Sequence, residues 1–110
     1  MIVDDCVALI GSANINDRSL QGDRDSEVMA LVVDSQVVPS RMGGAPWQAR
    51  GFAWTLRMRL WRQHLGLMEA PWDAVDLADP IAPDTYFGVW MKTALDNTKY
   101  YEHVYVTVVC

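Results

Sequence analysis

The hydrophobic and polar positions of this 110-residue chain predict short strands first and longer helices afterwards. The apolar run from Val7 to Ile10 lies between an acidic pair and Gly11, a pattern typical of a buried strand. The apolar pair Ile2-Val3 is interpreted as the stub of a partner strand across a tight turn. We therefore expect most of that partner strand to be missing, so that the sheet exposes an unpaired apolar edge.

The next apolar segment predicts a second central strand. Residues 14–25 are polar and rich in turn-forming side chains. From Glu27 to Val33 the chain alternates within a strongly apolar stretch that ends at Asp34. The expected order is therefore strand, polar loop, strand.

Helical periodicity begins after a connector that is expected over residues 37–45, which contain Pro39 and the pair Gly43-Gly44. The pattern from Trp47 to Leu65 predicts an amphipathic helix that stops at Gly66. One face of this helix carries large apolar side chains, namely Phe52, Trp54, Leu56, Met58, Leu60, Trp61 and Leu65. The other face carries arginines and is interpreted as solvated, namely Arg50, Arg57, Arg59 and Arg62.

The last third of the chain predicts a second helix. Prolines at 71, 80 and 83 interrupt the acidic segment that precedes it. Asp84 is expected to cap this helix, which runs toward Tyr101. The whole pattern predicts an α/β fold in which short strands are followed by two longer helices.

Composition and charge argue for a globular domain and against several classes of protein. About half of the residues are apolar (51%) and 21% are charged, which is typical of a packed globular domain. The net charge of −5 argues against a dedicated nucleic-acid binder. Cys6 and Cys110 lie far apart without metal-type or disulfide-framework spacing, so we expect a reducing, cytoplasmic location. Met1 is followed by neither a basic start nor a long apolar run, so no signal peptide or membrane-spanning helix is expected.

The first candidate for chemistry is the segment Gly11–Asn14. If the backbone stays extended, the side chains of Ser12 and Asn14 point to the same side. Gly11 removes a side chain where an anion would approach the backbone, and the hydroxyl and amide can donate hydrogen bonds to a phosphoryl oxygen. On spacing alone we favour the simpler alternative, a turn with local hydrogen bonds from side chain to backbone.

Glu27 is the second candidate, because a half-buried carboxylate at the entrance of a strand needs a partner. One possible partner is a histidine, whose tautomer and charged form the carboxylate would fix. The other is a structural ion pair with Arg18 or Arg24. The residues alone leave both alternatives open.

Asp4, followed after six residues by Gly11-Ser12 and shortly by Asn14, resembles the second half of the HKD motif of the phospholipase D superfamily. That motif begins with a histidine and a lysine, which would lie just before Met1. The segments 10–20 and 22–27 are similar to the eukaryotic branch that hydrolyses phosphatidylcholine. The resemblance therefore implies that residues 1–110 are a partial C-terminal catalytic domain, consisting of the second motif without its histidine and lysine and the helices that follow.

The resemblance implies a parent enzyme that hydrolyses phosphatidylcholine to phosphatidate and choline through a phosphohistidine, without a metal or cofactor. Its two motifs would meet across a pseudo-twofold interface, so the expected partners are the N-terminal catalytic half and a phospholipid membrane surface, to which the protein binds peripherally. Gly11, Ser12 and Asn14 would contact the substrate phosphate, and Glu27 would orient a catalytic histidine. Asp4, the motif aspartate, would shape the loop. The fragment alone is expected to be inactive.

Two other function classes stay open. The chain is alternatively a non-catalytic interaction module, or part of a nuclease or phosphatidyltransferase of the same superfamily. The acidic charge balance weighs against the nuclease.

Overall fold

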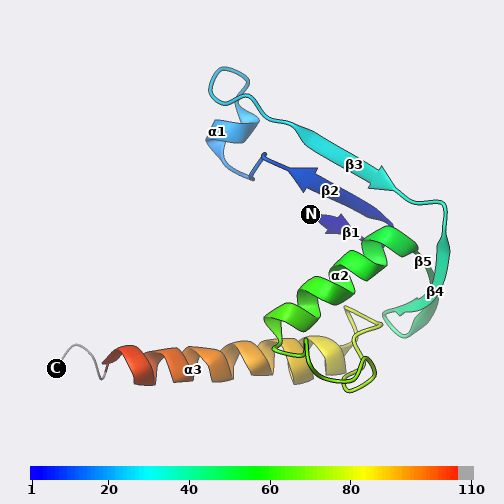
Figure 1. Cartoon of the computed structure of the whole chain (residues 1–110), viewed down its shortest axis with the longest axis vertical. Helices are drawn as coiled ribbons and strands as arrows, with labels where there is room; N and C mark the ends of the chain where they lie inside the picture. The colour runs from blue at the N-terminus through cyan, green and yellow to red at the C-terminus, as the bar shows by residue number, and fades with distance from the viewer. Residues whose placement is uncertain (107–110) are drawn as a thin grey trace. The chain divides into compact units, whose positions relative to one another are not determined.

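The computed structural model describes residues 1–106 and confirms a mixed α/β fold (Figure 1). The elements follow the order β1 (Ile2–Val3), β2 (Val7–Gly11), α1 (Asp17–Leu20), β3 (Met29–Val33), β4 (Val37–Met42), β5 (Ala45–Arg50), α2 (Gly51–His64), η1 (Asp84–Met91) and α3 (Lys92–Val106). The strands form two small antiparallel sheets, β1-β2-β3 and β4-β5. The chain divides into two compact units, residues 1–39 with 48–59 and residues 40–47 with the chain from residue 60 onward.

The turn between β1 and β2 is tight, as expected. Asp4 and Asp5 have φ angles of 51° and 53°, in the left-handed region that Asp tolerates better than most residues. The Cys6 amide donates to the Val3 carbonyl at 2.9 Å and closes the turn. The acidic pair therefore reverses the chain.

The strand β3 pairs antiparallel with β2, from Val7 opposite Val33 to Gly11 opposite Met29. Gly11 is required by this close pairing, because a Cβ there would lie 2.1 Å from the Val28 carbonyl oxygen. The prediction of a central strand is wrong for the described residues, since β3 forms the edge of its sheet. The unpaired apolar edge was expected at Ile2-Val3, and β1 does form the other edge of this sheet; Leu31 on β3 is 64% exposed.

The first unit is centred on small buried side chains and one buried ion pair. Ala8, Ala49 and Ala53 are almost fully buried. Arg57 donates from Nε and a terminal nitrogen to the two carboxylate oxygens of Asp5, at 2.6 and 2.8 Å. Placing Arg57 on a solvated face was therefore wrong, because the two-pronged pair lets the guanidinium be buried.

The segment expected to be a connector is a β-hairpin. Gly43 and Gly44 form its turn with φ angles of 63° and 81°, a conformation that suits glycine. The carboxylate of Asp79 accepts hydrogen bonds from both of their amides, at 2.9 and 2.7 Å. Because the hairpin continues to Arg50, α2 begins at Gly51 rather than near Trp47.

The end of α2 follows the prediction. Gly66 has a φ of 71°, its amide bonds the Gln63 carbonyl, and the Leu67 amide bonds the Arg62 carbonyl. This pattern is a Schellman motif. The side chain of Arg62 is buried, contrary to prediction. Its guanidinium donates hydrogen bonds to four backbone carbonyls, those of Leu67, Ala70, Pro71 and Trp72.

Two further details differ from the predicted helices. Phe52 and Leu60, assigned to the apolar face of α2, are about 40% exposed. The last helix opens with the π-helical segment η1, in which Asp84 is the first helical residue and Pro83 occupies the cap position without a side-chain hydrogen bond. The Tyr86 amide bonds the Ala82 carbonyl, so helical hydrogen bonding begins before Asp84 and leaves it no capping role.

Candidate functional site

The polar loop between β2 and β3 is organised by the short helix α1. Asn16 caps this helix, with its side-chain oxygen accepting the Ser19 amide at 3.0 Å. The Asn14 amide in turn donates to the Ser19 hydroxyl at 3.0 Å. These contacts place the Ser19 side chain between the loop and the strand that returns.

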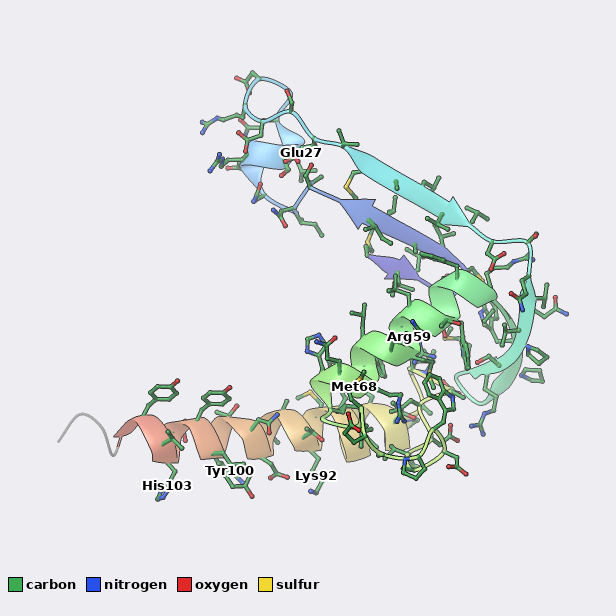
Figure 2. The ribbon with its side chains drawn as sticks, in the orientation of Figure 1. Glu27, Arg59, Met68, Lys92, Tyr100 and His103 are labelled. Atoms are coloured by element: carbon green, nitrogen blue, oxygen red, sulfur yellow. The ribbon has the colours of Figure 1, made fainter. Side chains whose placement is uncertain are left out.

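Glu27 precedes β3 and is half-buried beside α1 (Figure 2). Hydrogen bonds from the hydroxyls of Ser12 and Ser19 lower the pKa of the Glu27 carboxyl, and the Arg18 charge adds a smaller effect in the same direction. The Ser19 hydroxyl lies 2.5 Å from Oε1, a short charge-assisted hydrogen bond. Glu27 is therefore held ionised mainly by hydroxyl groups.

Arg18 pairs with Asp25 rather than with Glu27. Its Nε lies 2.9 Å from the Asp25 carboxylate, and the Asp25 amide donates to the Arg18 carbonyl at 3.2 Å. The predicted ion-pair alternative for Glu27 is thus not formed with Arg18.

Ser12 makes its side-chain hydrogen bond to the backbone of Val28, 16 residues along the chain, rather than to a neighbour within a turn. Its amide donates to the Val28 carbonyl at 3.1 Å, and its hydroxyl accepts from the Val28 amide at 3.0 Å. These bonds continue the pairing of β2 with β3 by one residue and hold the Ser12 oxygen in place.

An open pocket of about 510 Å³ brings together three of the predicted site residues. Its lining is polar throughout and consists of Ser12, Asn14, Asn16, Arg18, Ser19, Arg24, Asp25, Ser26 and Glu27. Hydroxyl, amide and guanidinium groups of this kind can donate hydrogen bonds to an anionic ligand such as a phosphate. No histidine of the described residues lines it, because His64 lies on α2 and His103 on α3.

The other two predicted residues do not line the pocket. Asp4 lies in the turn before β2, whereas Ser12 follows the strand. Gly11 is next to Ser12, but a glycine is needed there because a side chain would collide with the backbone at the start of β3. Both residues shape the strand pair, and their roles toward a substrate stay predictions.

The functional geometry includes residues that the sequence interpretation missed. The spacing of Asn16 and Ser19 is that of a helix cap, and this signal was readable. The contact of Ser19 with Glu27 spans eight residues across a loop, and the pairing of Asp5 with Arg57 spans 52. No local pattern reports contacts of that kind.

Residues 1–106 contain no group of three or more His, Cys, Asp or Glu side chains arranged to hold a metal ion. In the same residues, every helix is too short or too polar to cross a lipid bilayer.

Comparisons with known proteins extend these observations. The phospholipase D family profile matches residues 1–104. Phospholipase D zeta 1 of Arabidopsis thaliana is 52% identical over 98% of this chain and 10% of its own length. Phospholipase D C of Dictyostelium discoideum is 43% identical over 99% of the chain and 7% of its own length, and human Phospholipase D1 is 43% identical over 96% and 10%. The chain thus spans about a tenth of the length of the curated relatives that it matches.

Proposed function

The chain belongs to the phospholipase D family, and from this premise we propose that it forms one wall of the active site of a longer phospholipase D. The proposed reaction is hydrolysis of phosphatidylcholine to phosphatidate and choline. The observation that carries the proposal is the pocket in which Ser12, Asn14 and Glu27 meet, inside a segment that the family profile matches.

In the proposed mechanism, a histidine attacks the phosphorus and forms a P–N bond while the bond from phosphorus to the choline oxygen breaks. A second histidine gives its proton to the departing choline oxygen. Water then attacks the phosphorus and gives a proton to the second histidine, the P–N bond breaks, and phosphatidate leaves. Both histidines and the motif lysines belong to parts of the longer protein outside residues 1–110.

Ser12 and Asn14 would donate hydrogen bonds to the phosphoryl oxygens as negative charge develops there. The Ser12 oxygen is already fixed by the Val28 amide. Its proton, which is directed to Glu27, needs only a rotation about the C–O bond to reach a phosphoryl oxygen. The pocket therefore supplies donors whose heavy atoms do not have to move.

Glu27 would hold a ring nitrogen of one histidine. An ionised carboxylate stabilises the charged imidazolium and fixes which nitrogen faces the substrate. The hydroxyl hydrogen bonds that lower the pKa of Glu27 stabilise its ionised form, which is the form that this role requires.

The remaining partners follow from the same proposal. The N-terminal half of the longer protein supplies the first HKD motif, and the protein acts in the cytoplasm as a peripheral enzyme on a phospholipid surface. Residues 1–110 alone would release no choline, since neither histidine is present.

The test is an assay of the complete reading frame that contains this chain, with phosphatidylcholine vesicles as substrate and choline release as the readout. Ser12→Ala and Glu27→Ala are each expected to lower turnover by about 100-fold or more, the usual cost of losing a preorganised donor or its support. Lys99→Gln, an exposed change on α3, is the matched control. Wild-type turnover in either variant would refute the assigned roles.

Two additional readouts separate the alternatives. Trapping with phospholipid labelled at phosphorus should give a protein-bound phosphatidyl group whose P–N bond is labile to acid and stable to base, as expected of a histidine adduct. Cleavage of DNA in place of phosphatidylcholine would favour a nuclease. A complete reading frame that lacks any phosphodiesterase activity would favour the interaction module.

A further inference from the structure

The hydroxyl of Ser19 connects the two halves of the proposed phosphate site. It accepts the Asn14 amide at 3.0 Å and donates to Glu27 Oε1 at 2.5 Å. Its own backbone amide is held by the side chain of Asn16 at 3.0 Å. Ser19 therefore has its main chain fixed by the helix cap and its side chain fixed from two sides.

The direction of these hydrogen bonds is determined by chemistry. A backbone amide can only donate, so the Ser19 oxygen must accept from Asn14. An ionised carboxylate can only accept, so the single proton of the hydroxyl must go to Glu27. The proton cannot turn elsewhere without leaving a half-buried carboxylate short of a donor, which is costly.

We propose that Ser19 is a positioning residue, which fixes the Glu27 carboxylate relative to the loop that carries Asn14. The proposal rests on the function assigned above, in which Glu27 orients a catalytic histidine. Each carboxylate oxygen has two lone pairs, so hydrogen bonds from two serine hydroxyls leave acceptor capacity for an imidazole N–H. Ser19 thereby sets the place and the charge of the group that the histidine meets.

Ser19 differs from its neighbour Ser12 in this respect. The Ser12 oxygen belongs to the extended pairing with Val28 and lies next to the proposed phosphate position. Ser19 also lines the pocket, but its hydroxyl oxygen accepts from the Asn14 amide and its proton goes to Glu27. Ser12 would touch substrate, whereas Ser19 would act through Glu27.

The first test measures Glu27 directly in the 110-residue chain. The Glu27 carboxyl carbon is followed by NMR as the pH is lowered, with its signal assigned by Glu27→Gln. Ser19→Ala should raise the pKa of Glu27, because a donor to the ionised form is lost, whereas Ser19→Thr should leave it low. If Ser19→Ala does not fold, Ser19→Cys keeps the shape, weakens the donor and should raise the pKa in the same direction. An unchanged titration in the folded variant would overturn the proposal.

The second test uses the complete reading frame and choline release. Ser19→Ala should lower kcat on the order of 10–100-fold, the range for residues that orient a catalytic histidine, with little change in KM. Ser19→Thr should restore most of the rate, and Ser35→Ala, an exposed serine outside the pocket, is the control. Equal kcat for wild type and Ser19→Ala would overturn the proposal. A wild-type frame without choline release would instead overturn the proposed function, while a shifted Glu27 titration would still support the contact itself.

Discussion

Glu27 and Asp79 are two carboxylates that the fold treats in opposite ways. Glu27 is half-buried in an open pocket and is held by two serine hydroxyls. Asp79 is only 4% exposed and accepts the backbone amides of residues 43, 44, 81 and 82. Burial opposes the ionisation of Asp79, but these four amides outweigh it and lower its pKa.

The difference lies in the donors. Backbone amides cannot turn, so the Asp79 site is closed and joins a hairpin to a distant loop. The Ser12 hydroxyl can rotate about its C–O bond, so the Glu27 site can redirect this donor to a ligand without moving a heavy atom while Ser19 keeps its bond to Glu27. The pKa values of both carboxyls are lowered, yet we assign the two groups different roles. The kind of donor, a rotating hydroxyl or a fixed amide, separates these roles, whereas the direction of the pKa shift does not.

The largest effect on stability is expected from Asp79→Ala, which tests whether Asp79 is the structural carboxylate of the two. The change leaves four backbone amides without the buried carboxylate that accepts from them, and we expect it to lower the free energy of unfolding by about 3 kcal/mol. Urea unfolding of the 110-residue chain measures this, with the exposed Asp73→Ala as the control. A loss no larger than that of the control would mean that Asp79 is not the structural carboxylate described here.

The second effect is expected from Glu27→Gln, which keeps the shape of the side chain and removes its charge. Turnover of the complete protein should fall about 100-fold, because a neutral amide stabilises an imidazolium poorly. The midpoint of urea unfolding should stay close to that of the wild type. A large shift of the midpoint would place Glu27 in the same structural class as Asp79.

The third effect is the dependence of stability on pH. Both carboxyls have pKa values in the folded state below their ordinary values of 4.5 for Glu27 and 3.8 for Asp79. Each therefore contributes stability that is complete above the unfolded-state pKa and is lost as the pH falls through the folded-state pKa. Unfolding free energies measured between pH 7 and pH 2 should fall less steeply for Asp79→Asn than for the wild type. An identical slope would contradict the assigned hydrogen bonds.

The smallest effect is expected from the exposed ion pair of Arg18 and Asp25. Their side chains are 72% and 37% exposed, so Arg18→Gln should cost less than about 1 kcal/mol. A double-mutant cycle with Asp25→Asn in low and high salt gives the coupling energy. A coupling of several kcal/mol that is insensitive to salt would show that this pair supports the pocket as firmly as Asp79 supports the hairpin.

The sequence predicted the parts of the fold that depend on neighbouring residues. The strand from Val7, the turn at the acidic pair and the helix stop at Gly66 each have a local signal of apolar pattern or backbone preference. The meeting of Ser12, Asn14 and Glu27 was also foreseeable, because two paired strands bring the ends of their connecting loop together.

The remainder depends on contacts between distant residues. Arg57 was assigned to solvent because helical periodicity says nothing about a carboxylate 52 residues away. The pair Gly43-Gly44 was interpreted as a connector, although glycine pairs are equally typical of hairpin turns. The acceptor that stabilises this turn, Asp79, lies 35 residues farther along the chain.

The burial of Arg57 and Arg62 has a practical consequence for digestion by trypsin. This protease needs the side chain of its target in an extended, accessible segment, and these two residues are 5% and 4% exposed and bonded to oxygen acceptors. Arg59, two residues from one and three from the other, is exposed on the same helix (Figure 2). The early peptide map of the folded chain should therefore omit cuts after 57 and 62, and their appearance would mark the moment at which α2 unfolds.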